Sequence, residues 1–172
     1  MNGEERDAAI VGGAVVEAID VRGLAPLVAL NNAHAVELSW LDDDKMAVLV
    51  RRSFRARAAG GGAGFLLAFD QDADYGSPNF LWFKERHERF VYVDRVVVDP
   101  AARGRGLARA LYEDLFAAAI AAEHTLVTCE VNMVPSNPAS DAFHARLGFA
   151  EVGRAVLPGS GKRVRYLARP LP

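Results

Sequence analysis

The chain has 172 residues, of which 51% are hydrophobic and 24% are charged, proportions typical of a globular protein with one substantial core. Its net charge of -2 argues against broad nucleic-acid binding, which usually requires a basic face. The single cysteine, Cys129, excludes an internal disulfide and a cysteine-based zinc cluster, and its apolar neighbours predict a buried thiol.

The beginning of the chain carries no targeting signal that the sequence makes visible. Residues 1–7 are acidic and lack the basic-then-apolar order of a signal peptide. The weakly polar run at 8–16 contains two glycines and is too short to span a bilayer. We therefore expect a cytoplasmic protein with one domain over residues 1–172, in which residues 1–12 are poorly ordered or loosely packed.

The first half of the chain predicts two helices and three strands. A strand at 15–19 precedes a helix at 24–38, whose apolar residues recur at helical spacing. A second helix begins at the aspartates 42–44, which suit a helix N-terminus better than a metal site, and ends near Arg52. Strands at 53–58 and 64–70 flank a glycine-rich turn and form a hairpin.

The segment that follows contains aspartates at positions 70, 72 and 74. Their spacing is that of a calcium loop, but Tyr75 and Leu81 occupy the positions where such a loop needs glycine and glutamate. A solvated loop is the better interpretation. Ser77-Pro78 then predicts the start of a short aromatic helix that reaches residue 87.

The second half of the chain alternates strands and helices and ends in a hairpin. The predicted elements are a strand at 90–98, a helix at 104–122, a strand at 125–131, a helix from Asn137-Pro138 to Leu147-Gly148, and strands at 150–157 and 163–168. Together with the first half, this order predicts an α+β or α/β domain built around a mixed sheet.

The turn between the strand at 90–98 and the next helix reads Asp-Pro-Ala-Ala-Arg-Gly-Arg-Gly, residues 99–106. Such a turn directs backbone N–H groups and the positive end of a helix dipole at one point, which favours phosphate. The Lys-Ser/Thr pair of a P-loop is missing. Arg109 stands at the third glycine position of a dinucleotide-binding motif, so a degenerate dinucleotide site, with Glu130 at the end of the next strand, is a minor alternative.

Two motifs resemble those of the GNAT superfamily of N-acetyltransferases. The first, Arg103-x-x-Gly106-x-Ala108, matches R/Q-x-x-G-x-G/A and follows the lead-in Val96-x-Val98-x-Pro100. The second, Asn137-x-x-Ser140-x-x-x-His144-x-x-x-Gly148-Phe149, is similar to N-x-x-A-x-x-x-Y-x-x-x-G-F. The resemblance implies a mixed, mostly antiparallel central sheet flanked by helices, with a splayed parallel strand pair that binds CoA.

The resemblance also implies acetyl-CoA as a co-substrate and no metal. Backbone N–H groups of the turn would hold the pyrophosphate, and freed backbone groups of the preceding strand would pair with the pantetheine arm. Asn137 would contact the same arm, although a helix N-cap explains it equally well. The expected CoA-binding residues are Val96, Val97, Val98, Arg103, Gly104, Arg105, Gly106, Leu107, Ala108, Asn137, Ser140 and Phe143.

Direct acetyl transfer to a primary amine requires a base, a donor for the developing oxyanion, and an acid for the departing thiolate. The resemblance assigns the oxyanion to the N–H of Val98 or a neighbour. It places His144 where the family commonly has an acidic tyrosine, and packing is the alternative role for this histidine. Asp94 and Glu130 are candidate bases, either of which could instead be a structural ion-pair partner. Glu37 is a third candidate, because the resemblance implies that the region joining the first two helices shapes the acceptor pocket.

The acceptor is expected to be a small-molecule or peptide amine, bound without nucleic acid or membrane by a chain that could form a homodimer. The predicted substrate-binding residues are Asn31, Glu37, Trp40, Tyr75 and Trp82, with Asn32, His34, Ser39, Asn79 and Phe83 beside them. Aromatic rings near acids suit a cationic substrate, although each ring also suits a core position. A non-catalytic acyl-CoA-binding or sensor module is the alternative function, favoured by the missing tyrosine.

Overall fold

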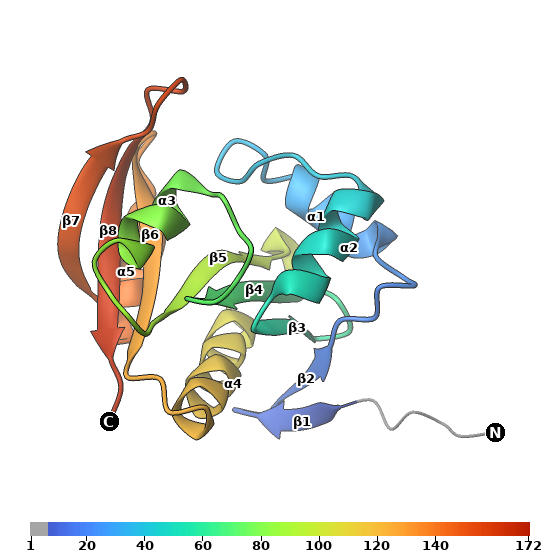
Figure 1. The fold of residues 1–172 in the computed structure, drawn as a ribbon. Helices are drawn as coiled ribbons and strands as arrows, with labels where there is room; N and C mark the ends of the chain where they lie inside the picture. The colour runs from blue at the N-terminus through green and yellow to red at the C-terminus, as the bar shows by residue number, and fades with distance from the viewer. Residues whose placement is uncertain (1–6) are drawn as a thin grey trace. The chain divides into compact units, whose positions relative to one another are not determined.

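The computed structural model describes residues 7–172, which form eight strands and five α-helices (Figure 1). The first elements are β1 (Ala8–Val11), β2 (Ala14–Ala18), α1 (Ala25–Asn32), α2 (Asp43–Arg52), β3 (Arg55–Ala59), β4 (Gly64–Asp70) and α3 (Pro78–Lys84). They are followed by β5 (Val91–Val98), a short 3-10 helix (Pro100–Ala102), α4 (Leu107–Ala121), β6 (Leu126–Val134), α5 (Pro138–Arg146), β7 (Ala150–Val156) and β8 (Arg163–Pro170).

The strands form a sheet in the order β1-β2-β3-β4-β5-β6-β8-β7. β5 and β6 are parallel, with a register that pairs Val91 with Val127 and Tyr92 with Thr128. The other registers described, β1 with β2, β2 with β3, β3 with β4, β6 with β8 and β7 with β8, are antiparallel. The mixed, mostly antiparallel sheet with one parallel pair confirms the fold class predicted from the sequence.

The chain forms two compact units, and the first comprises residues up to Ala68 together with Arg95–Ala118. Its core is the face where α1 and α2 cover β3 and β4 (Figure 1). Met46 of α2 and Phe65 and Leu67 of β4 are fully buried there, next to Leu27 of α1. Burial of side chains of this size stabilises the unit by about 1.5–3 kcal/mol each.

The second unit comprises Phe69–Asp94 and Ala119–Pro172. Figure 1 shows its strands β6, β8 and β7 side by side, in orange to red. Its core is aromatic: the Phe83 ring lies 5.2 Å from that of Tyr166 and the Phe80 ring 5.6 Å from that of Phe90, measured between ring centroids. Cys129 on β6 is buried, as predicted.

Residues 1–12, predicted to be poorly ordered or loosely packed, include a strand, β1, that the sequence does not predict. Residues 8–11 pair with β2, Ile10 opposite Val15, around a turn in which Gly12 and Gly13 have positive φ. The side chains of this strand are mostly exposed, 79% in the case of Ile10, so no alternation of buried and polar residues marks the strand. Residues 1–6, which share the prediction, lie outside the described part.

The helix predicted at 24–38 ends early, at Asn32. The side chain of Asn32 donates to the Leu41 carbonyl at 2.8 Å and accepts from the Leu41 N–H at 3.0 Å. Asn31 donates to the Ser39 carbonyl at 2.9 Å. Asparagine side chains that bond to neighbouring backbone compete with helix formation, and here they fold the segment after α1 back onto the helix end.

The helix predicted at 104–122 begins three residues late, at Leu107. Gly104 and Gly106 have φ values of 78° and 75°, which belong to the left-handed region and interrupt a right-handed helix. The helix predicted to reach residue 87 also ends early, at Lys84, and Ser77 makes no side-chain capping bond.

The remaining predicted helices and strands are confirmed, with shifts at their ends. Asp42 caps α2 by accepting a hydrogen bond from the Lys45 N–H at 2.8 Å. In the described residues, no helix has the length and apolar character needed to cross a membrane.

Candidate active site

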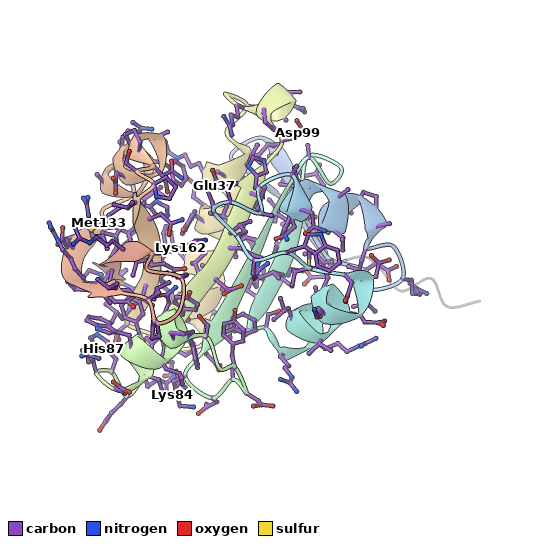
Figure 2. All side chains as sticks on the ribbon, turned by 90° about the horizontal axis from the view of Figure 1, so that it is seen from above. Glu37, Lys84, His87, Asp99, Met133 and Lys162 are labelled. Carbon is purple, nitrogen blue, oxygen red and sulfur yellow. The ribbon has the colours of Figure 1, made fainter. Side chains whose placement is uncertain are left out.

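The turn between β5 and α4 is held by Asp99, which Figure 2 labels where the chain leaves β5. Its carboxylate accepts a hydrogen bond from the Ala101 N–H at 2.8 Å, and its own N–H donates to the Ala63 carbonyl at 2.7 Å. A Cβ built on Gly104 or Gly106 would meet nothing within 4 Å. The fixed turn therefore exposes its backbone to open space, where a ligand can approach it closely.

The charge of this turn suits an anion. Arg103 and Arg105 are exposed, and the first N–H groups of α4, which begins at Leu107, have no acceptor within the helix by geometry. The helix dipole adds positive potential at the same end. These groups fit the pyrophosphate of an acyl-CoA.

A cavity of about 370 Å³ adjoins the start of α4 within the first unit. It is lined by Gly13, Ala14, Val15, Gly60, Gly61, Arg105 and Leu107. A Cβ on Gly60 would lie 2.9 Å from Cδ1 of Leu107, so the β3–β4 turn packs tightly against the helix start. The cavity shares Arg105 and Leu107 with the residues expected to bind CoA.

The three valines expected to flank the pantetheine arm end β5. Val97 is 4% exposed and packs in the core of the first unit, while Val96 and Val98, which alternate with it, are partly exposed. The described register between β5 and β6 covers Val91 and Tyr92 only on the β5 side. The valines lie beyond that register.

α5 holds the second motif. Asn137 caps the helix, since its side chain accepts from the Ser140 N–H at 3.2 Å, while Phe143 is partly buried. His144 is 3% exposed, and its ring lies 5.3 Å from each of the Phe143 and Phe149 rings. Its Nδ1 lies 2.8 Å from the Ser140 carbonyl oxygen, a distance that assigns the proton of the neutral ring to Nδ1.

The environment of His144 disfavours its charged form. Burial lowers the pKa of the imidazole, against the opposing influence of the Ser140 carbonyl and the Asp141 charge. With the proton on Nδ1, Nε2 is an acceptor. Proton donation from Nε2 would need the imidazolium, so the geometry favours packing for His144.

Glu130 of β6 lies in a cluster of polar side chains in the second unit. The Tyr92 hydroxyl donates to its Oε2 at 2.7 Å, and Asn79 also hydrogen-bonds to the carboxyl group. Burial raises the pKa of Glu130 to about 8, with the hydrogen bond from Tyr92 acting in the opposite direction. Burial and the neighbouring Glu130 charge raise the pKa of Tyr92 well above its usual value, so this phenol remains a donor.

Asp94 belongs to the same cluster. The Tyr75 hydroxyl donates to its carboxylate, and the Tyr75 ring stacks on Phe69 with centroids 4.2 Å apart. The negative charge of Asp94 contributes to the raised pKa of Glu130. The structure thus brings together both predicted bases and one predicted substrate residue.

Sequence reasoning missed Tyr92 and Tyr166 as members of this cluster. Tyr92 lies two residues before Asp94 in a strand, which places both side chains on one face. Tyr166 is the cross-strand partner of Glu130 in β8. The alternation in β5 could have identified Tyr92, whereas Tyr166 depends on a strand pairing that the sequence does not reveal.

Trp82 of α3 is partly packed. Its ring stacks on Tyr166 with centroids 4.2 Å apart, and the Arg86 guanidinium lies 4.0 Å from its ring centroid on a cation–π contact. A Cβ on Gly153 of β7 would lie 2.5 Å from the Trp82 ring, so only glycine leaves room for it. These contacts favour a structural part for Trp82.

The other three predicted substrate residues lie in the first unit. Asn31 is fully buried and accepts from Arg95 at 2.9 Å, so its polar atoms serve the chain itself. Glu37 is exposed in the segment after α1 (Figure 2). Trp40 is 60% exposed, with the Lys45 ammonium 5.8 Å from its ring centroid. Glu37 and Trp40 therefore remain accessible to a ligand.

Among residues 7–172, no three or more His, Cys, Asp or Glu side chains are grouped so that they could hold a metal ion. The aspartates after β4 shape a turn instead, since Asp70 accepts from the Asp72 N–H at 3.0 Å.

An exposed glycine turn follows β5 in a mostly antiparallel sheet with one parallel pair, the arrangement expected of a CoA-dependent acyltransferase. The family model of the acetyltransferase (GNAT) family matches residues 35–149. The chain belongs to this family. It is an N-acetyltransferase whose acetyl donor is acetyl-CoA.

Solved structures of low sequence identity share the fold. The ribosomal-protein-S18-alanine N-acetyltransferase of Escherichia coli is 17% identical, with a TM-score of 0.67 over 92% of this chain and 94% of that one. A putative acetyltransferase of Salmonella typhimurium, yncA, solved with acetyl-CoA, is 19% identical, with a TM-score of 0.68 over 92% and 94%.

Naa20 of Chaetomium thermophilum, solved with a bisubstrate analogue, is 20% identical, with a TM-score of 0.70 over 91% of this chain and 86% of that one. No curated protein matches the sequence.

Proposed function

We propose that this N-acetyltransferase moves the acetyl group of acetyl-CoA directly to a primary amine in a ternary complex, with Glu130 as the general base. The observation that carries the proposal is the partly buried carboxyl of Glu130, held by the Tyr92 hydroxyl at 2.7 Å beside Asp94. A carboxyl group that is partly ionised near neutral pH is suited to removing a proton from an ammonium group.

The turn supplies the donor site in this proposal. Backbone N–H groups from Arg103 to Ala108 bind the pyrophosphate, with Gly104 and Gly106 leaving their approach open. Backbone groups at Val96–Val98 pair with the pantetheine amides. Bound acetyl-CoA supplies the activated thioester.

The acid–tyrosine cluster acts on the acceptor. Asp94, with Tyr75, attracts the ammonium form of the amine, and Glu130 accepts its proton. The N–H of Val98 or a neighbour donates to the developing oxyanion. β5 carries Tyr92 and Asp94 and then continues into the turn, so one strand bears residues of both functions.

His144 could act as the predicted acid for the thiolate only if its ring carried the charge of an imidazolium. Burial of the ring disfavours that charged form. We therefore give His144 a packing role against Phe143 and Phe149. The thiolate of CoA is a weak base compared with an amine, so its departure requires less assistance than amine deprotonation does.

The acceptor is a small-molecule or peptide amine, whose ammonium group meets Asp94 and Tyr75 in the second unit. Both classes occur among structures of this fold: one neighbour acts on an alanine of ribosomal protein S18, and another is a putative phosphinothricin N-acetyltransferase. We place the protein in the cytoplasm, as one functional domain that could pair with a second copy.

The test is thiol release from acetyl-CoA across a panel of amino acids, peptides and small amines, with wild type and Glu130→Gln in parallel. We expect turnover on at least one amine, and a loss of that turnover in the variant. Tight CoA binding without turnover on any amine supports instead a non-catalytic acyl-CoA sensor, which the histidine at the usual tyrosine position favours.

A further inference from the structure

A chain of hydrogen bonds reaches Glu130 from two other elements of the second unit. Glu130 of β6 and Tyr166 of β8 are direct partners in the antiparallel register, so their side chains lie on one face of the sheet. Asn79 of α3 is 8% exposed and joins them. Its Oδ1 accepts from the Tyr166 hydroxyl at 3.0 Å, and its side chain also hydrogen-bonds to Glu130.

The Tyr166 hydroxyl meets the oxygen end of the Asn79 amide, which leaves the nitrogen end for Glu130. A phenol donates its single proton, here to Oδ1 of Asn79, and the amide nitrogen is then directed to the carboxyl group. Burial raises the pKa of Tyr166 to about 12, so the phenol remains a donor throughout the range in which Glu130 titrates.

Glu130 is surrounded by groups of opposing influence. Burial and the charge of Asp94 on β5 disfavour its carboxylate, whereas the donors Tyr92 and Asn79 favour it. Tyr166 from β8 faces Glu130 as a neutral phenol, and the charge of Arg86, which follows α3, lowers the pKa of Tyr166 against the effect of burial. Tyr75, bound to Asp94, completes the set of neighbouring titratable groups.

We propose that Asn79, oriented by the Tyr166 hydroxyl, is a positioning residue that aims the Glu130 carboxylate and stabilises its charged form. The catalytic consequence of this inference rests on the proposed function, in which Glu130 is the base. In this role Asn79 contacts Glu130 of the protein itself and not the acceptor substrate, beside whose predicted binding residues the sequence analysis placed it.

Tyr166, at the far end of the chain of hydrogen bonds from Glu130, is held in place by packing. The Tyr166 ring stacks on Trp82 with centroids 4.2 Å apart, and Gly153 makes room for that indole. Tyr166→Phe keeps the stacked ring and removes only the hydroxyl, which frees the Asn79 amide to rotate. This variant tests orientation without opening a cavity.

The direct test is the titration of Glu130 in the free protein, by carbon NMR of side-chain carboxyls labelled with ¹³C and assigned through Glu130→Gln. A hydrogen bond to a charged group is worth about 1.5–3 kcal/mol, and one pKa unit corresponds to 1.36 kcal/mol. We expect Asn79→Leu to raise the pKa of Glu130 by about one unit, and Tyr166→Phe to shift it less in the same direction.

Asn132→Leu is the matched control, because Asn132 is partly exposed on the same strand, two residues from Glu130. An unchanged Glu130 titration in this control, with the shifts above, supports the proposal. No shift in Asn79→Leu, or an equal shift in Asn132→Leu, overturns it. If Asn79→Leu does not fold, the absence of any shift in Tyr166→Phe overturns it alone.

Kinetics of the two variants separate this inference from the proposed function. A one-unit rise in the pKa of the base lowers the rate at pH 7 about tenfold and leaves it unchanged above pH 10. A shifted NMR titration with this pH-dependent loss supports both proposals. A shifted titration with unchanged rates supports the positioning by Asn79 and contradicts Glu130 as the base.

Discussion

The glycine turn after β5 and the acid–tyrosine cluster around Glu130 are built in opposite ways. The turn is contiguous in sequence, exposed, and made of backbone: two glycines at positive φ leave open space for a ligand. The cluster assembles side chains from α3, β5, β6 and β8, and it is held by hydrogen bonds among them. In the proposed function, the donor site therefore depends on local conformation, whereas the acceptor chemistry depends on tertiary packing.

The largest effect should come from removing the base of the cluster. Glu130→Gln keeps the shape of the side chain and loses proton acceptance, so turnover should fall by about 10²–10⁴-fold. Affinity for CoA, measured by calorimetry, should stay within twofold because the turn is untouched. A large loss of CoA affinity would contradict the assignment of CoA binding to the turn and of proton acceptance to the cluster.

The corresponding change in the turn should affect only the binding of the donor, acetyl-CoA. Gly106→Glu places a side chain at a φ of 75° and a negative charge in the proposed pyrophosphate site. Strain and charge repulsion should together weaken CoA binding at least about 100-fold. Gly104→Ala, the control, adds a Cβ in the left-handed region without charge and should weaken it less.

Retained CoA affinity in Gly106→Glu contradicts the assignment of this turn to phosphate. A loss of affinity supports the assignment only if the variant still unfolds cooperatively. The melting curve is needed because a left-handed glutamate costs about 1–2 kcal/mol of stability.

The pH dependence of stability sharpens the description of the cluster. A carboxyl group whose pKa is raised to about 8 on folding stabilises the protein below its unfolded pKa, and this contribution is lost as pH rises through 8. Glu130→Gln removes that loss. The variant should gain stability relative to wild type between pH 5 and pH 9, by on the order of 2 kcal/mol in urea titrations; a constant difference contradicts the buried carboxyl.

The smallest effect is expected at His144. His144→Phe keeps an aromatic ring between Phe143 and Phe149, and turnover should fall less than about threefold if the imidazole only packs. His144→Ala, which empties the site, is the comparison for packing. A loss of turnover above about 100-fold in His144→Phe, with CoA affinity unchanged, restores the histidine as the thiolate acid.

The sequence predicted local structure well and tertiary polar contacts poorly. The hairpin, β5 and the capped helix α5 follow from alternation, periodicity and cap residues, which are local signals. α1 ended early because Asn31 and Asn32 bond to backbone around Leu41, an interaction that helical periodicity cannot report. β1 was missed because its exposed residues form no alternating pattern.

The same distinction holds at the site. The turn motif identified the donor because its glycines act through backbone geometry within a few residues. Tyr166 meets Glu130 only through the β6–β8 register, which no spacing in the sequence specifies. The raised pKa of Glu130 likewise depends on its burial, a property of the folded chain.

The most direct test of the account is the ratio of wild-type to Glu130→Gln turnover on one accepted amine, measured from pH 6 to pH 10. Ionisation of the amine is common to both proteins and cancels in the ratio. With a base of pKa about 8, the ratio should rise about tenfold between pH 7 and pH 9, with its midpoint near pH 8. A ratio near one, or one independent of pH, contradicts Glu130 as the base.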